Sequence, residues 1–431
     1  MPVTAWNSTG REFRRGPDSR FAHRTTPSPT DVGHSTDQLC AAAGGDGFSM
    51  TSRGWDTLSM RVRVRGVVCL LVAAGFFGAT AGSGHAAPKP STMPRDVGAR
   101  ISRHQSHLPR QLKCVPWPTH GWPTGPLPSG VDSAAVGAAA NEMVGPGRGD
   151  SVVVIHGGRL VYERYAPGVT ADSILPSFSV SKSFTSTMIG LLVDRGRLEL
   201  DDRAPIAEWS AQTDPRRSIT LRNLLNMSSG LQWTEDYFNF QSDVVQMIVS
   251  GDESRYVIAK PLEFTPGTRW RYSTGDTAVL GRIIADTARV SGDGYLAYLH
   301  NQLFDPLGIN PVQAGFDAAG RWRAGWLTNT TTRNFAKLGL LYLRNGRWEN
   351  KRFLSSKWVD FVRTPSPAYS GYGGQFWLNS DGTFEMIGLY GQSVHIIPDL
   401  DLIIAVNNGT GDFPMLQAFR NAKPASCSHR A

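Results

Sequence analysis

The sequence predicts a mixed α/β (α+β) fold, in which an antiparallel sheet flanked by helices is built from both ends of the chain. Short runs rich in β-branched and aromatic residues occupy positions 151–156 and 159–165, and similar runs return near the carboxyl terminus. Between them, residues 179–364 read as mostly helical. Strands at both ends with helices between them indicate one sheet and an inserted helical lobe. The sheet-bearing lobe would comprise residues 131–178 and 365–431.

Each element has a local signal. Residues 132–143 favour a helix, and Gly157-Gly158 between two strand-like runs predicts a β-hairpin. Apolar periodicity, with proline and glycine as punctuation, predicts the inserted helices at 179–195, 220–226, 276–289, 293–303, 331–344 and 355–363. The later strands are expected at 375–379, 383–387, 393–397 and 402–406, followed by a closing helix at 413–421.

The positive net charge belongs to the leading part of the chain. The 431 residues carry a formal charge of +8, and residues 1–113 hold 15 Lys and Arg against 7 Asp and Glu. The remaining residues hold 29 of each sign and are therefore neutral. A neutral folded part carries no electrostatic footprint for nucleic acid, so we expect no nucleic-acid partner.

The first 130 residues read as export and linker sequence. Residues 1–59 have the composition of a disordered upstream extension, which an upstream choice of start codon would explain. Residues 60–87 combine a basic start, an apolar run and a small-residue end, which predicts a secretory signal peptide and an exported protein. The run is short for a membrane span, although a retained anchor is an alternative. Residues 88–130 contain nine prolines and are expected to form a linker and lead-in segment, which leaves 131–431 as the main domain.

Two cysteines remain after removal of such a signal. Cys114 and Cys427 lie near opposite ends of the mature chain. An exported protein folds where disulfides persist, and both chain ends are expected on the sheet-bearing lobe. We therefore predict a Cys114–Cys427 disulfide.

A Ser-x-x-Lys signature stands at the start of the inserted lobe. Ser179 and Lys182 are three residues apart at the beginning of a strongly apolar helix, which Ser177 or Ser179 can cap. This spacing puts both side chains on one face. The alternative is a capping serine beside a solvated lysine, because so short a motif also arises by chance. A lysine buried in such a helix would instead approach the neutral form that a base requires.

Further stretches resemble the serine hydrolases related to class C β-lactamases and D-Ala-D-Ala peptidases, and most of all the aminohexanoate-dimer hydrolases and their esterase relatives. The resemblance covers about residues 130–420 and implies a β-lactamase/transpeptidase-like fold. The stretches that carry it, in the order of the family, are Ser179-Val-Ser-Lys182, Leu224-Leu-Asn-Met-Ser-Ser-Gly-Leu231, Pro266-Gly-Thr-Arg-Trp-Arg-Tyr-Ser-Thr274, Thr332-Arg-Asn-Phe-Ala-Lys-Leu-Gly-Leu-Leu-Tyr-Leu343 and Gly388-Leu-Tyr-Gly-Gln392.

The resemblance implies a role for each catalytic position. Ser179 would be the nucleophile, Lys182 would take its proton, and Tyr272 would pass a proton to the leaving group. The backbone N–H groups of Ser179 and Gln392 would form the oxyanion hole. The reaction would pass through an acyl-enzyme, with neither a metal nor another cofactor.

Two positions depart from the family pattern. Thr274 stands where the Tyr-x-Asn motif has an asparagine, and Leu389-Tyr390-Gly391 stands where the family has Lys-Thr-Gly. The chain thus lacks the cation that would hold a β-lactam or D-alanine carboxylate, which favours a small ester or linear amide as substrate. Candidate pocket residues are Thr274, Leu389, Tyr390, Gly391, Trp233 and Tyr237.

Other readings stay open at this stage. A β-lactamase or D-alanyl-D-alanine carboxypeptidase acting on cell-wall peptides is one, and a non-catalytic penicillin-binding-like module is another. A Ser/His/Asp hydrolase using Ser393 and His395 lacks the strand–turn–helix context that its motif needs. The sequence leaves the oligomeric state and the substrate undetermined.

Overall fold

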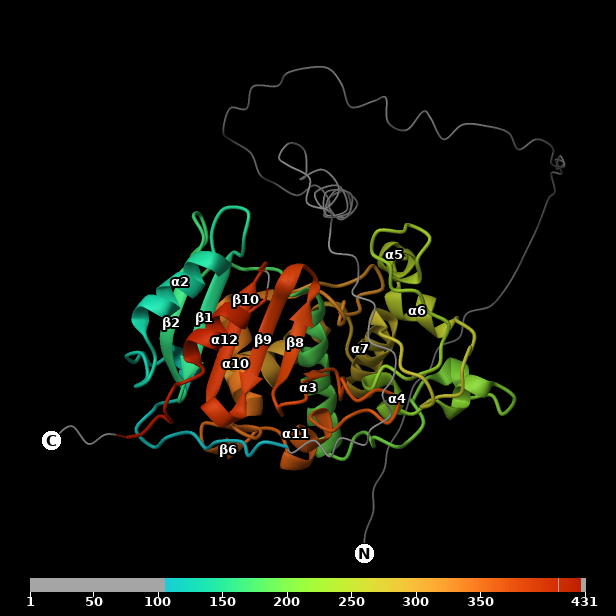
Figure 1. Cartoon of the computed structure of the whole chain (residues 1–431). Helices are drawn as coiled ribbons and strands as arrows, with labels where there is room; N and C mark the ends of the chain where they lie inside the picture. Colours follow the sequence, from blue (N-terminus) through green and yellow to red (C-terminus); the bar gives the residue numbers. More distant parts are fainter. Residues whose placement is uncertain (1–104, 410, 428–431) are drawn as a thin grey trace, which may run out of the picture. The chain divides into compact units, whose positions relative to one another are not determined.

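A six-stranded antiparallel sheet dominates the computed structural model, which describes residues 105–409 and 411–427 (Figure 1). These residues all fall within one compact unit. The strand order is β2-β1-β10-β9-β8-β7. The strands are β1 (Ser151–His156), β2 (Arg159–Tyr165), β7 (Trp377–Leu378), β8 (Phe384–Gly388), β9 (Gln392–Ile397) and β10 (Leu402–Asn407). The predicted fold class is confirmed, since the sheet takes strands from both ends of the chain.

Strands from the amino- and carboxyl-terminal parts of the domain pair within this sheet. β1 pairs with β10 from Ser151 opposite Asn407 to His156 opposite Leu402. The hairpin between β1 and β2 turns through two glycines with φ of +59° and +79°, the left-handed conformation that a two-residue hairpin turn requires. β7 is the edge strand on the other side of the sheet, and it is shorter than the strand predicted at 375–379.

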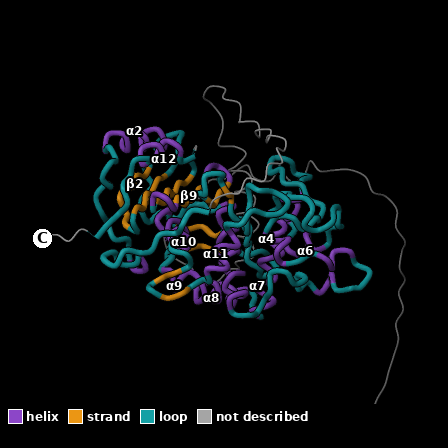
Figure 2. Tube along the Cα trace, turned by 60° about the horizontal axis from the view of Figure 1, so that its bottom comes forward, coloured by secondary structure: helices purple, strands orange, loops and turns teal. Residues whose placement is uncertain are grey.

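Helices cover both faces of the sheet. Successive residues of a strand point to opposite faces, and these strands carry apolar residues on both faces. Val152 and Val154 of β1 pack with α2 and α12, whereas Val153 and Ile155 join the larger core on the opposite face. Figure 2 shows α2 and α12 on one side of the strands and α10 and α11 on the other. The bounds are α2 Ser133–Met143, α10 Thr332–Leu343, α11 Ser356–Val362 and α12 Phe413–Phe419.

Helix α3 (Ser181–Asp194) runs through the larger core, and every residue from Ser181 to Leu192 is buried. The predicted helix at 179–195 therefore exists, but its first turn is a separate 3-10 helix, η2 (Phe178–Val180). The predicted serine cap is wrong, because no side chain caps either helix. The Ser177 hydroxyl instead accepts the Thr328 N–H at 2.9 Å and donates to the Trp326 carbonyl at 3.2 Å.

The inserted lobe contains several helices besides α3. Three of them, α5, α6 and α9, were not predicted, because each is shorter than two turns and shows little periodicity. The helices are α4 (Leu221–Leu225), α5 (Asp243–Val249), α6 (Glu253–Ile258), α7 (Thr274–Ala288), α8 (Gly292–Leu299) and α9 (Asp305–Leu307), with a π-helix, η5 (His300–Phe304), before α9. Short strands β3 (Val312–Ala314) and β4 (Thr328–Thr330) form one pair, and β5 (Arg347–Trp348) and β6 (Lys351–Arg352) form another. The short 3-10 helices are η1 (Pro118–His120), η3 (Ala207–Trp209), η4 (Pro215–Ser218), η6 (Leu389–Gly391) and η7 (Pro398–Leu400).

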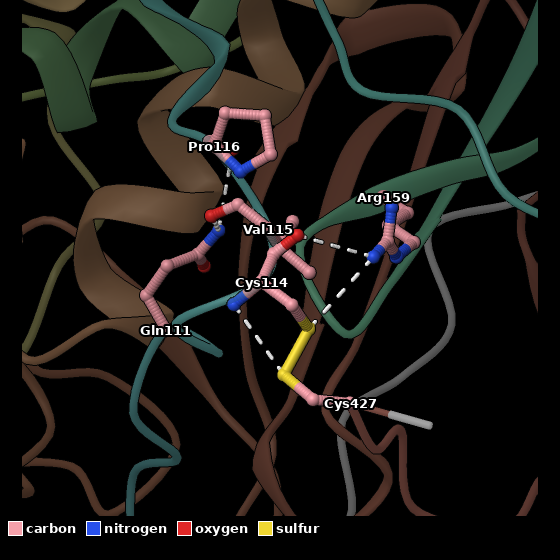
Figure 3. Close-up of a disulfide and its surroundings, with 6 residues drawn as sticks. All are labelled: Gln111, Cys114, Val115, Pro116, Arg159 and Cys427. Atoms are coloured by element: carbon pink, nitrogen blue, oxygen red, sulfur yellow. Dashed lines mark hydrogen bonds between the residues drawn. A yellow bond between two sulfur atoms is a disulfide. The ribbon is translucent and has the colours of Figure 1, made fainter. Parts of the chain in front are cut away.

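The proline-rich lead-in segment is fastened to the domain at several points. The Trp117 ring lies 5.3 Å from that of Trp348, and the Trp122 indole donates a hydrogen bond to the Arg333 carbonyl at 3.0 Å. Cys114 and Cys427 form a disulfide with their Cα atoms 5.8 Å apart, beside Arg159 at the start of β2 (Figure 3). This bond ties the lead-in segment to the carboxyl-terminal tail.

The predicted extension at 1–59 and signal peptide at 60–87 lie outside the described residues, so both stay predictions. Within residues 105–409 and 411–427, no helix combines the length and the apolar character that a membrane span needs.

Candidate active site

Ser179 and Lys182 lie together at the junction of η2 and α3. The Lys182 Nζ atom is 2.9 Å from the Ser179 Oγ atom. Ser179 is half-buried, whereas the Lys182 side chain is fully enclosed, with 1% exposure. Phe178, directly before the serine, has a positive φ of 41°, which is strained for a residue with a side chain. The chain therefore enters this junction through a strained turn that leaves the serine accessible and the lysine covered.

Lys182 has two further partners. Its Nζ atom lies 3.0 Å from the Thr274 Oγ1 atom on α7 and 2.8 Å from the Gly325 carbonyl oxygen. Burial lowers the pKa of Lys182 to about 8, although the negative charges of Glu235 and Glu253 raise it in part. A neutral amine that donates its two hydrogens to Thr274 and Gly325 keeps its lone pair for the Ser179 hydroxyl. In this geometry the amine could take the proton of the hydroxyl that it faces.

Tyr272 lies beside both Lys182 and Ser179. Its ring centroid is 5.0 Å from the Lys182 Nζ atom. Burial and the charge of Glu235 raise the pKa of the Tyr272 phenol above its usual value, and hydrogen bonding to Ser179 lowers it by less. The phenol thus keeps its proton at neutral pH beside the Ser179 hydroxyl, where it can supply that proton to a leaving group.

An aromatic cluster that the sequence did not predict supports Tyr272. The Trp377 ring on β7 stacks on Tyr272 at 5.6 Å, and the Tyr372 ring meets Tyr272 edge-on at 6.2 Å. Trp270 packs against Tyr369 at 4.5 Å. Segments about a hundred residues apart contribute these rings, so neither segment alone carries a recognisable signal.

The segment from Gly388 to Gln392 begins against η2, the turn that carries Ser179. A Cβ atom on Gly388 would lie 2.7 Å from the Ser177 carbonyl oxygen, so β8 passes against η2 with no room for a side chain. Gly391 has φ of +77°, and a Cβ there would lie 1.8 Å from the Gly409 oxygen, so only glycine fits. Gln392 pairs with Gly388 across β8 and β9, and Gly388 is the residue that lies against Ser177 and Phe178.

Side chains of the same segment differ in exposure. Leu389 is half-buried and Gly391 is partly exposed. Tyr390 is 48% exposed, and its ring lies 5.5 Å from that of Phe178. The Gln392 side chain is buried and accepts the Asn408 N–H at 2.7 Å, so it anchors the segment from within.

The loop that follows α4 contributes Glu235, which sequence reasoning missed. Its carboxylate accepts the Thr274 N–H at 2.9 Å and also the Thr274 hydroxyl. It further accepts the Tyr237 hydroxyl at 2.5 Å and the Trp233 indole N–H. The aromatic residues around Glu235 drew attention to this loop, but no local pattern distinguishes this carboxylate from its neighbour Asp236.

The two predicted aromatic residues of this loop lie in different environments. Tyr237 is half-buried, and its hydroxyl lies 3.3 Å from the Thr274 Oγ1 atom. Trp233 is only 3% exposed, and a Cβ on Gly275 would come within 2.7 Å of its ring. Trp233 therefore packs behind α7, and it acts on the site through Glu235 rather than by facing a substrate.

The alternative Ser/His/Asp set does not assemble. The His395 Nε2 atom lies 2.9 Å from Thr383 Oγ1, and its Nδ1 atom lies 2.7 Å from Asp412. The buried Ser393 hydroxyl makes no hydrogen bond to any described residue. His395 thus links β9 to the residues before β8 and α12. No cluster of three or more His, Cys, Asp or Glu that could hold a metal ion occurs among the residues described.

The chain is similar in sequence to several known hydrolases. The 6-aminohexanoate-dimer hydrolase of Paenarthrobacter ureafaciens is 26% identical over 283 residues, which cover 59% of this chain and 71% of that protein. The lovastatin esterase of Penicillium rubens is 32% identical over 169 residues, covering 33% of this chain and 40% of the esterase. Esterase EstB of Burkholderia gladioli is 27% identical over 195 residues, 40% of this chain and 47% of EstB.

Solved structures share the fold. A Bacillus anthracis protein provisionally assigned as a 6-aminohexanoate-dimer hydrolase superposes with a TM-score of 0.55 at 22% identity, covering 74% of this chain and 88% of that one. A penicillin-binding protein of Bacillus halodurans gives 0.52 at 16% identity, over 66% of this chain and 99% of that one. At these identities the likeness concerns the fold alone. The family profile described as Beta-lactamase matches residues 140–422, well over half of the chain. The chain therefore belongs to the Beta-lactamase family, and it is a serine hydrolase of that family.

Proposed function

We propose that the protein cleaves a small ester or linear amide through an acyl-enzyme on Ser179. The observation that carries this proposal is the 2.9 Å approach of the Lys182 amine to the Ser179 hydroxyl. Burial gives this lysine a pKa of about 8, so a substantial fraction is neutral near physiological pH. A half-exposed hydroxyl beside a neutral amine is an activated nucleophile, because the amine can take its proton.

The reaction proceeds in two steps. The Ser179 Oγ atom attacks the substrate carbonyl while its proton moves to the Lys182 amine. Tyr272 gives its proton to the leaving group and recovers one from the Lys182 side, so the charge of the site is restored. The backbone N–H groups of Ser179 and Gln392 stabilise the oxyanion, and losing one such donor costs about 3 kcal/mol. Water then attacks the acyl-enzyme by the reverse proton path.

The side chains at the Gly388–Gln392 segment favour a neutral substrate. Leu389 supplies no cation where a β-lactam or D-alanine carboxylate would need one. Bringing an unpaired carboxylate into a partly buried site is costly. The names of the relatives, an aminohexanoate-dimer hydrolase and two esterases, agree with hydrolysis of an amide or an ester.

The same proposal includes export from the cytoplasm. The signal-like sequence at 60–87 supports it. The Cys114–Cys427 disulfide supports it independently, because disulfides form and persist in oxidising compartments. Fractionation of cells producing the full chain, with mass determination of the amino terminus, tests this part. Protein that stays in the cytoplasm with residues 60–87 attached would refute it.

A panel of substrates tests the hydrolase proposal on purified protein. We expect kcat/KM to decrease from a p-nitrophenyl acyl ester to a linear aminohexanoate-type amide and then to a chromogenic cephalosporin. An active-site serine reagent should label Ser179, which a non-catalytic binding module would not allow. If the cephalosporin were the best substrate, the β-lactamase alternative would replace this one.

A further inference from the structure

Glu235 occupies a position from which it can control how the catalytic lysine is oriented. A carboxylate has about four acceptor sites. Here four donors use it: the Thr274 N–H and hydroxyl, the Tyr237 hydroxyl and the Trp233 indole. None of these donors is a lysine or an arginine, and Glu235 forms no ion pair among the described residues. The carboxylate is therefore a hub for neutral donors rather than half of a salt bridge.

The Thr274 hydroxyl links this hub to the base. A hydroxyl has one hydrogen, and Glu235 accepts it. The lone pairs of Thr274 Oγ1 are thereby left to accept an N–H from Lys182, whose Nζ atom is 3.0 Å away. The Gly325 carbonyl, which can only accept, lies at 2.8 Å. With both hydrogens of the neutral amine directed at these acceptors, the lone pair faces Ser179 Oγ.

We propose that Glu235 is a positioning residue of the hydrolase, which acts through the Thr274 hydroxyl to aim the lone pair of Lys182 at Ser179. This inference rests on the proposed function, because it presumes that neutral Lys182 takes the Ser179 proton. Glu235 touches neither the nucleophile nor the base. It fixes the direction of one hydroxyl hydrogen, and that hydrogen decides whether Thr274 accepts from the lysine or donates to it.

The proposal predicts the effect of Glu235→Gln on turnover. The amide would present two N–H groups to a region filled with donors, and one of them would compete with Lys182 for Thr274 Oγ1. We expect kcat to fall by about ten- to a hundredfold, the range that hydrogen bonds to charged groups imply, with KM little changed. Thr274→Val removes the linking hydroxyl and should do the same. Thr274→Ser keeps the hydroxyl and should stay within about threefold of wild type.

The double variant Glu235→Gln/Thr274→Val separates a link from two independent effects. If Glu235 acts through Thr274, the double variant should be no slower than the worse single variant, because the two residues form one path. Multiplied losses in the double variant would overturn the proposed path. Glu263→Gln is the matched control, since Glu263 is an exposed glutamate paired with Arg271, and its kcat should equal that of wild type.

The pH dependence of kcat/KM distinguishes a positioning role from general structural damage, which would not shift its acid limb. Ser179, Tyr272, Thr274 and the Gly325 carbonyl face Lys182, and Glu235 and Glu253 are the carboxylates that raise its pKa. Glu235→Gln removes one of these charges and leaves the other. The acid limb of kcat/KM should therefore move to lower pH in Glu235→Gln but stay near its wild-type position in Thr274→Val, which keeps the charge.

The outcomes distinguish this inference from the proposed function. Turnover that survives in Ser179→Ala would refute the hydrolase mechanism itself, whatever Glu235 does. If Ser179→Ala is inactive while Glu235→Gln keeps both the wild-type kcat and the wild-type pH profile, the positioning role alone is refuted. Thermal melts of each variant identify loss of folding, and Thr274→Val still tests the link if Glu235→Gln does not fold.

Discussion

The Cα atom of Gly388 on β8 lies so close to the Ser177 carbonyl oxygen before η2 that a Cβ would be only 2.7 Å from it. This contact joins the sheet to the turn that carries Ser179. Gln392 pairs with Gly388 across β8 and β9, so the same contact bears on where the Gln392 N–H stands relative to Ser179.

Gly388→Ala should therefore reduce activity and stability together. The added methyl must push β8 and η2 apart, since its nearest neighbour is backbone, and such overpacking costs about 1–3 kcal/mol. The shift would move the oxyanion donors, so kcat should fall at least about tenfold. Thermal unfolding and ester hydrolysis measure the two effects. Gly137→Ala in α2, where nothing lies within 4 Å of the added Cβ, is the control and should leave kcat unchanged.

Ser179→Ala should abolish turnover while the protein still folds. Removing the nucleophile of a cooperating set costs a factor of about a thousand or more in kcat. Labelling with an active-site serine reagent should disappear as well. Ser181→Ala provides the comparison, because this neighbouring hydroxyl is buried against Thr328 at 2.5 Å and cannot reach a substrate. Activity retained in Ser179→Ala would place the nucleophile elsewhere.

The rate should rise with pH through the titration of Lys182. Below a pKa of about 8 the amine is protonated and has no lone pair to accept the Ser179 proton. We therefore expect kcat/KM to rise about tenfold per pH unit below this value and to level off above it. A p-nitrophenyl ester followed from pH 5.5 to 9.5 tests this, after subtraction of spontaneous hydrolysis. Lys182→Arg, which cannot become neutral, should be inactive throughout, and a flat wild-type profile would contradict the assignment.

Substrate preference should respond to a cation at position 389. Leu389→Lys places an ammonium where an anionic substrate would bring its carboxylate. The ratio of kcat/KM for a cephalosporin to that for a neutral ester should rise at least about tenfold, which corresponds to roughly 1.4 kcal/mol. Leu389→Met controls for the changed shape and should leave the ratio unchanged. An equal ratio in all three proteins would show that position 389 does not contact the carboxylate.

The Cys114–Cys427 bond should contribute to stability but not to turnover. It joins two residues that are 313 positions apart in sequence. Losing a native disulfide typically lowers the free energy of unfolding by about 2–5 kcal/mol. The Cys114→Ser/Cys427→Ser protein should melt at a lower temperature than oxidised wild type, with the same kcat. Reductant should lower the melting temperature of wild type and have no effect on the double variant. Two free thiols in non-reduced wild-type protein would refute the Cys114–Cys427 disulfide.

Local sequence signals were sufficient for much of the fold. The hairpin of β1 and β2 appears at the predicted residues, because the glycine turn and the β-branched runs act over a few positions. The long helices α3, α7 and α10 likewise follow from their apolar periodicity. The short helices α5, α6 and α9 were not predicted, since tertiary packing stabilises helices of fewer than two turns.

The sequence by itself determined the fold class and the adjacency of Ser179 and Lys182, because a three-residue separation at a helix start fixes which side chains meet. The tertiary structure alone decided what surrounds that pair. Thr274 and Gly325 contact Lys182 across sequence separations of 92 and 143 residues, and Glu235 contacts Thr274 across 39 residues. Such contacts depend on how whole elements pack in three dimensions, and no local periodicity encodes them.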